Sequence, residues 1–223
     1  LIDNLDKIGG QCSELYPDKP IYDIPSQVVI SAQELVDNLM LQCKPFNPVF
    51  HLNQKAEKLV KDEKDNWVVT TDNGEEITAT CIVIAAGSGS FVPRKPPINN
   101  IENYEEKSVF YSVKDKSLFK NKKVLIAGGG DSAIDWVNEL SKIASVSLVH
   151  RRKEFRAAAD SVKKMKILEK NNKIKFYLGK PVELNGNEGK LKSIIIADEN
   201  NNNKEIETDY LIALYGLKME LGP

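Results

Sequence analysis

A glycine-rich loop between a predicted strand and a predicted helix constrains this chain more than any other feature. Residues 128–133 read GGGDSA; a predicted buried strand over 122–127 precedes them, and a stretch with helical apolar spacing, 132–144, follows. The run fits the motif G-x-G-x-x-A, whose three defined positions are Gly128, Gly130 and Ala133. In this setting the first glycine of the motif allows a tight turn, its second glycine lets backbone approach a diphosphate, and the small third residue lets helix and strand pack closely. The N–H groups that begin the helix attract the anion. The pattern predicts a dinucleotide site at Gly128, Gly130, Asp131, Ser132 and Ala133.

The residues after the next predicted strand, 146–149, indicate which dinucleotide is bound. A site for NAD has Asp or Glu about 20 residues after the loop, where the carboxylate takes the ribose 2′-hydroxyl. Here the corresponding positions are His150, Arg151 and Arg152, with Arg156 one turn further. Guanidinium groups bind a 2′-phosphate through charge-assisted hydrogen bonds, so this pattern favours NADP(H). The basic run 151–175 could also be a solvated face, and we interpret its later lysines in that way.

Around this motif the second half of the chain reads as one α/β unit. Strand, helix and strand follow one another within about 30 residues, as in a β-α-β unit. A basic helix over 157–170, a strand over 174–178, a hairpin around 200–203 and a last strand over 210–214 are predicted to complete it. The proline-rich stretch 93–98 and the residues up to 117 have no sustained period, which predicts a surface connection with a domain boundary near residue 105.

The first half predicts a helix followed by a β-meander. Ser31 and Glu34 have the spacing of a capping box, and the apolar residues after them recur with a helical period as far as Lys44-Pro45. Short β-type runs then cover 58–61, 66–71 and 76–86, with Asp72-Asn73-Gly74 as a hairpin signal. In this interpretation the meander leads into a strand over 81–86.

Composition excludes several functions. The 31 Lys and Arg balance 32 Asp and Glu, so a formal charge of −1 gives no bulk field for nucleic acid or a membrane surface. The longest apolar run falls far short of the roughly 20 residues that span a bilayer, and a soluble protein is expected. Cys12, Cys43 and Cys81 match no zinc spacing and no redox pair, which predicts free thiols, a cytoplasmic location and no metal site. Because the chain begins at Leu1, we expect residues to be missing in front of it.

Four separated segments carry a resemblance to a known family. GGGDSAIDW followed by SLVHRRKEFRA resembles the NADP(H)-binding domain of thioredoxin reductases and, more closely, of the thioredoxin-reductase-like ferredoxin/flavodoxin–NADP(+) reductases. The opening LIDNLDKIGGQCSELYPDKPIYDIP is similar to the FAD-domain segment of the second family, and YSVKDKSLFKNKKVLIAGGGDSA to its crossover into the NADP domain. The similarity covers nearly the whole chain.

This resemblance implies an α/β fold with two Rossmann-like three-layer units, the first incomplete, and a small antiparallel β-meander in each. The implied domains are a partial FAD-binding domain over 1–105 and an NADP(H)-binding domain over 106–223. The family's first glycine-rich loop should lie about 20 residues before Leu1 by the spacing rule. Neither that loop nor the family's C-terminal Gly-Asp flavin segment is found in the sequence, and we expect a chain truncated at both ends that does not hold FAD tightly.

The resemblance also implies contacts to FAD. Asp3 matches an acidic residue on the adenosine ribose, and Gln11 matches a glutamine at the flavin portion. Tyr16 matches an aromatic residue stacked on the isoalloxazine ring, while Ala56 and Phe91 match positions that line the adenine and the ring region. Taken without the resemblance, each has a plainer interpretation as a strand-end acid, a loop residue or a core residue.

The implied activity is that of a flavoprotein oxidoreductase. Hydride passes between NADPH and FAD, and the flavin exchanges single electrons with ferredoxin or flavodoxin, without a catalytic side chain. A homodimer is expected for the intact enzyme. Thioredoxin reductases carry Cys-x-x-Cys just before the second glycine loop, but 112–117 contains no cysteine, and dithiol exchange needs a thiolate pair. Two alternatives stay open: a non-catalytic NADP(H)-binding fragment or interaction module, and a degenerate thioredoxin reductase without the cysteine pair.

Overall fold

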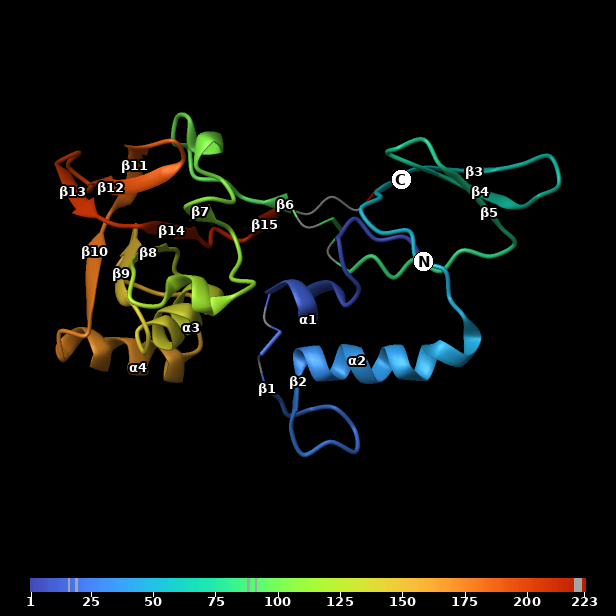
Figure 1. Cartoon of the computed structure of the whole chain (residues 1–223), viewed down its shortest axis with the longest axis horizontal. Helices are drawn as coiled ribbons and strands as arrows, with labels where there is room; N and C mark the ends of the chain where they lie inside the picture. Colours follow the sequence, from blue (N-terminus) through green and yellow to red (C-terminus); the bar gives the residue numbers. More distant parts are fainter. Residues whose placement is uncertain (16, 19, 88, 91, 219–221) are drawn as a thin grey trace. The chain divides into compact units, whose positions relative to one another are not determined.

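The chain forms two compact units of mixed helices and strands (Figure 1). The computed structural model describes residues 1–15, 17–18, 20–87, 89–90, 92–218 and 222–223. Unit 1 consists of Leu1–Val92 and Leu217–Pro223, and unit 2 of Pro93–Gly216. The predicted α/β class is confirmed. A domain boundary near residue 105 stays a proposal; by their contacts, residues 93–105 belong to unit 2.

The centre of unit 2 is a parallel sheet with the strand order β10-β9-β8-β14-β7. From β8 the chain runs outward through α3, β9, α4 and β10, and later returns to form β14 on the opposite side of β8. The order therefore reverses between β8 and β14, and ligands of such sheets bind at the carboxyl ends of the strands beside this point. The bounds are β7 (Val109–Phe110), β8 (Lys123–Ala127), α3 (Asp131–Leu140), β9 (Ser145–His150), α4 (Ala159–Lys170), β10 (Ile174–Leu178) and β14 (Tyr210–Ala213).

A second, antiparallel sheet covers one face of the parallel one. It is a meander of β11 (Lys180–Asn187), β12 (Lys190–Ala197) and β13 (Asn203–Glu207), as predicted for the hairpin around 200–203. Its Ile194 and Ile196 share one buried cluster with Leu125 and Leu211 of the parallel sheet. Each such side chain contributes about 1.5–3 kcal/mol by burial. Side chains alternate along a strand, so the fully buried Ile126 lies on the other face, toward the helices.

The stretch predicted as a surface connection is more structured than its sequence indicated. Ile98 and Ile101 are buried in the same cluster, the latter in the 3-10 helix η2 (Ile101–Asn103). Val109 begins β7, which adds an edge strand to the parallel sheet beside β14. A second 3-10 helix, η3 (Lys116–Phe119), precedes β8. The prediction of a surface connection was wrong here, because a two-residue strand such as β7 is too short to show the alternation of apolar and polar residues by which a strand is found in a sequence.

Unit 1 contains the predicted helix and meander. Ser31 Oγ accepts a hydrogen bond from the Glu34 amide at 3.2 Å, and a Glu34 carboxylate oxygen accepts one from the Ser31 amide at 2.9 Å, so the capping box is confirmed. The strands β3, β4 and β5 pair antiparallel in that order. The bounds in unit 1 are α1 (Gly10–Leu15), β1 (Pro20–Ile21), β2 (Ile30–Ser31), α2 (Ala32–Cys43), η1 (Lys44–Phe46), β3 (Ala56–Lys61), β4 (Trp67–Thr71) and β5 (Glu76–Ala79); β6 (Val92–Pro93) and β15 (Leu217–Lys218) are short strands where the chain passes between units.

The strand predicted over 81–86 is not formed. The last strand of the meander ends at Ala79, and 81–86 belongs to no strand, with 88% of Val83 and 77% of Ile84 exposed. The apolar stripe of α2 is buried only at Ala32 and Val36. An apolar run forms a strand only where neighbouring strands supply hydrogen-bond partners, and the part of unit 1 that the structure describes supplies none to 81–86.

Candidate dinucleotide site

The first glycine of the loop is required by packing. A Cβ on Gly128 would lie 2.6 Å from the carbonyl oxygen of Leu214 and 2.9 Å from the Cβ of Ala133, which is itself fully buried. The Gly128 amide donates to Val149 O at 3.1 Å, and the Leu214 amide donates to Ala127 O at 2.7 Å. Gly128 and Ala133 therefore let α3 begin directly against the ends of the central strands, as the motif predicts.

The loop's third glycine is open to the outside. Gly130 is the N-cap of α3 with extended backbone and no side-chain cap, and a Cβ built on it would meet nothing within 4 Å. Its carbonyl accepts hydrogen bonds from the amides of Ala133 and Ile134, at 3.1 and 3.2 Å. The surface over Gly130 is therefore free for a diphosphate, at the end of α3 where the helix dipole favours an anion. The half-buried Ser132 lies in this first turn.

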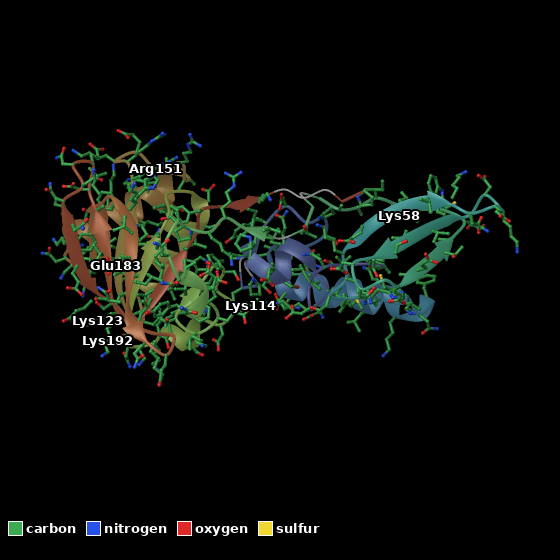
Figure 2. The ribbon with its side chains drawn as sticks, turned by 90° about the horizontal axis from the view of Figure 1, so that it is seen from above. Lys58, Lys114, Lys123, Arg151, Glu183 and Lys192 are labelled. Carbon is green, nitrogen blue, oxygen red and sulfur yellow. The ribbon has the colours of Figure 1, made fainter. Side chains whose placement is uncertain are left out.

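The arginines follow β9 on the loop 151–158, which we call the arginine loop. Arg151, Arg152 and Arg156 are exposed, and among the residues that the structure describes no carboxylate forms an ion pair with them. Figure 2 shows Arg151 at one end of unit 2 and Lys123, the first residue of β8, at the other. The guanidinium groups thus belong to the carboxyl end of the sheet, where a 2′-phosphate would be bound.

Backbone hydrogen bonds hold the arginine loop on the glycine loop. The Arg156 amide donates to Gly129 O at 2.7 Å, and Gly130 and Arg156 form a parallel β-bridge. The Ala158 amide donates to a carboxylate oxygen of Asp131 at 2.8 Å. The structure therefore brings together two segments that the sequence places more than 20 residues apart.

His150 has a packing role beside the glycine loop. A Cβ on Gly129 would lie 2.4 Å from the His150 ring, and the ring stacks on Phe155 with centroids 5.4 Å apart. Burial lowers the pKa of His150 below its ordinary value of 6.5; the charges of Arg151 and Arg152 act in the same direction, and a hydrogen bond with the Glu154 backbone opposes them. The neutral ring supports the loop and adds no positive charge to it.

Sequence reasoning missed two residues of this region. Tyr215 follows β14 at the same end of the sheet; its side chain is 38% exposed, yet burial raises its pKa to about 12, and the charge of Arg151 acts in the opposite direction. Phe155 lies between His150 and Phe176, the second ring pair being 5.6 Å apart. The only sequence signal for Phe155 was that it is an apolar residue within a basic run. No sequence signal pointed to Tyr215.

The residues predicted for FAD lie in unit 1. A carboxylate oxygen of Asp3 accepts from the Leu5 amide at 3.1 Å, Gln11 is exposed on α1, and Ala56 is the half-buried first residue of β3. Tyr16 and Phe91 lie outside the described residues. The fully buried Ser13 Oγ on α1 packs against Gly9 and has no hydrogen-bond partner among the described atoms. These five assignments stay proposals.

Other kinds of site find little support. The described residues contain no group of three or more side chains that could hold a metal ion, and the three cysteines are free. No helix in the described part of the chain is long and apolar enough to cross a bilayer. A cavity of about 710 Å³ lies between the segment 99–107 and the β11–β12 hairpin, and none of the predicted site residues lines it.

Comparison with known proteins defines the class of protein. Residues 18–221 match the pyridine nucleotide-disulphide oxidoreductase family, and the chain belongs to this family. The crystal structure of Lactococcus lactis thioredoxin reductase (FR conformation) matches with a TM-score of 0.78 and 24% identity, covering 98% of this chain and 69% of that one. The bacillithiol disulfide reductase Bdr of Bacillus cereus matches with a TM-score of 0.74 and 16% identity, covering 97% and 69%. At these identities the likeness shows the fold.

Within that family, curated relatives are more similar in sequence. The ferredoxin–NADP reductase of Parvibaculum lavamentivorans is 50% identical over 224 residues, and that of Pelagibacter ubique 49% identical over 223. Both alignments cover 100% of this chain but 65% and 66% of the relative, so the chain spans somewhat less than two thirds of these relatives' length. The resemblance drawn from the sequence is confirmed.

Proposed function

We propose that unit 2 binds NADP(H) across the carboxyl end of its parallel sheet. The diphosphate lies over Gly130 at the start of α3, and the 2′-phosphate lies against Arg151, Arg152 and Arg156. The single observation that carries this proposal is the arginine loop, which is hydrogen-bonded to the glycine loop at 2.7 Å and carries guanidinium groups that form no ion pair with the described residues. NAD(H) has no 2′-phosphate, so these charges discriminate between the two nucleotides.

The activity proposed for the whole protein is electron transfer between NADPH and ferredoxin or flavodoxin through FAD. Its support is the identity of 46–50% to relatives named ferredoxin–NADP reductase. When bound, FAD supplies the step from two-electron to one-electron chemistry. Asp3, Gln11, Tyr16, Ala56 and Phe91 are proposed to hold it. The chain's own residues bind and orient the nucleotide, and no side chain serves as a general acid or nucleophile.

Two further properties belong to this proposal. A cytoplasmic location is proposed, and three free thiols support it, because reduced cysteines are typical of a reducing compartment. A homodimer is proposed for the whole protein. Reduction of thioredoxin is not proposed, since no cysteine lies between 82 and 223, including the segment 112–117 that precedes β8.

Titration calorimetry with NADPH and NADH tests the nucleotide site on the 223-residue chain. NADPH should bind more tightly than NADH by about tenfold or more. A tenfold difference in dissociation constant corresponds to about 1.4 kcal/mol, which is the lower end of what one charge-assisted hydrogen bond contributes. Equal affinity for the two nucleotides would refute the NADP(H) assignment. For the whole protein, NADPH-dependent reduction of ferredoxin tests the proposed activity, with NADH as the comparison donor.

A further inference from the structure

Asp131 lies where a carboxylate is unfavourable to the proposed ligand. It is the first residue of α3, next to the open surface over Gly130, and a negative charge there repels a diphosphate. The helix dipole is favourable to this carboxylate, but any Asp or Glu in the first turn would serve that purpose. The specific contact of Asp131 is elsewhere: its Oδ1 accepts a hydrogen bond from the Ala158 amide at 2.8 Å, 27 residues further along the chain.

This contact closes the arginine loop onto the start of α3. At its first end the loop leaves β9 at His150, whose ring lies over Gly129 and stacks on Phe155. At its second end the Arg156 amide donates to Gly129 O at 2.7 Å. The bond between Ala158 and Asp131 fixes the loop just before α4 begins. Arg151 and Arg152 therefore project from a segment that is held at both ends.

The helix α4 has anchors of its own. Ser161 Oγ donates to a carboxylate oxygen of Asp135 at 2.8 Å, and Asn138 Nδ2 donates to Ser161 O at 3.0 Å. These bonds join α4 to α3 one turn beyond the loop. Loss of the contact between Asp131 and Ala158 is therefore expected to loosen the arginine loop and to leave the packing of the two helices intact.

We propose that Asp131, which the glycine motif predicts to be part of the dinucleotide site, is instead a positioning residue for nucleotide specificity: it holds the arginine loop in place for the 2′-phosphate and does not itself bind the nucleotide. This inference rests on the proposed NADP(H) site. A loop that is already held in its binding conformation loses less entropy when the phosphate binds. NADH gains nothing from the arginines, so the contact affects NADPH alone.

Two opposing effects of Asp131 can be separated. Its charge acts on the diphosphate, which NADPH and NADH share, and so changes both affinities by the same factor. Its hydrogen bond to Ala158 acts through the arginine loop and changes only the affinity for NADPH. The effect of the charge on the shared diphosphate cancels from the ratio of the two dissociation constants, Kd(NADH)/Kd(NADPH). Any effect of the charge on the 2′-phosphate is measured separately with Asp131→Asn, which removes the charge and keeps the acceptor, so the other variants report the hydrogen bond.

The test measures this ratio by titration calorimetry on the 223-residue chain at one salt concentration. Asp131→Ala removes the acceptor, and Ala158→Pro removes the donor; the φ of −52° at Ala158 is close to that of proline. Asp131→Asn removes the charge but keeps an acceptor oxygen. Asp160→Ala is the matched control, because it removes an exposed carboxylate at the start of α4 whose ion pair among the described residues is with Lys164 of the same helix.

We expect Asp131→Ala and Ala158→Pro each to lower the ratio about three- to tenfold, the factor of one hydrogen bond. Asp131→Asn and Asp160→Ala should leave it within about twofold. An unchanged ratio in the first two variants would overturn the inference, and so would an equal fall in Asp131→Asn. If one of the two variants does not fold, as judged by circular dichroism, the other decides. A wild-type chain without preference for NADPH refutes the proposed function itself, before any variant is compared.

Discussion

Gly128 and Ala133 approach each other so closely that a Cβ on the glycine would lie 2.9 Å from the Cβ of the alanine. The Leu214 carbonyl oxygen, at the end of β14, would be nearer still, at 2.6 Å. Gly130, two residues along, has nothing within 4 Å of the corresponding position. Within one short motif, the first glycine is required by the packing of the fold, and the later one leaves space for a ligand.

Replacing these two glycines should therefore affect different properties: stability for Gly128 and nucleotide binding for Gly130. Gly128→Ala should lower the free energy of unfolding by about 1–3 kcal/mol, because a buried methyl group forces neighbouring backbone to move. Gly130→Ala, at a φ of −93°, should change it by no more than about 0.5 kcal/mol, as expected for a surface site. Urea unfolding measures both values.

Gly130→Ala should also weaken nucleotide binding. The methyl group of Gly130→Ala occupies the space over the start of α3, so NADPH and NADH should both bind less tightly, by similar factors. Calorimetric titration of the folded variant checks this. Unchanged affinity for both nucleotides would place the diphosphate away from Gly130.

The arginines should act on one nucleotide only. Replacing Arg151 and Arg152 together with Ala should remove about 2–4 kcal/mol of NADPH binding, the contribution of two charge-assisted groups, and should leave NADH binding nearly unchanged. A matched control replaces Lys163 and Lys166, two exposed cations of α4, with Ala. If replacing the two lysines weakens NADPH binding as much as replacing the two arginines does, the effect comes from the general positive charge and not from a specific site.

His150 should give the folded chain a pH dependence near neutrality. Burial lowers its pKa below 6.5, so the unfolded chain binds a proton near pH 6.5 that the folded chain binds only at lower pH. The stability due to neutral His150 is thus fully present above pH 6.5 and is lost as the pH falls through the folded pKa. His150→Phe keeps a ring against Phe155 and cannot titrate. Urea unfolding at a series of pH values from 5 to 7.5 should show a smaller slope for this variant; equal slopes would contradict the assignment.

The cysteines should be dispensable for electron transfer. Cys43 and Cys81 are exposed, Cys12 is half-buried, and none forms a disulfide. A triple variant with Ser at all three positions, made in the full-length flavin-loaded protein, should keep most of its NADPH-dependent reduction of ferricyanide. Neither form should reduce thioredoxin, because a dithiol relay needs paired thiols. Loss of ferricyanide reduction in a folded variant that retains flavin, or reduction of thioredoxin by the parent, would contradict this.

The sequence alone determined those parts of the structure that depend on neighbouring residues. The order of strand, glycine loop, helix and strand around Gly128 predicted β8, α3 and β9 to within a few residues. Ser31 and Glu34 predicted the start of α2, because a capping box joins residues only three positions apart. The position of Arg151 after a strand end located the basic groups, since parallel strands end at the same edge of a sheet.

The tertiary structure decided what depends on partners far along the chain. Val109–Phe110 became a strand because β14, about 100 residues later, offers it hydrogen bonds, whereas 81–86, the more apolar run, finds no paired strand among the described residues. The hydrogen bond between Asp131 and Ala158 is likewise a contact between residues far apart along the chain. No local pattern encodes such contacts, because the free energy of a buried strand or a closed loop comes from the groups that pack and hydrogen-bond across the fold.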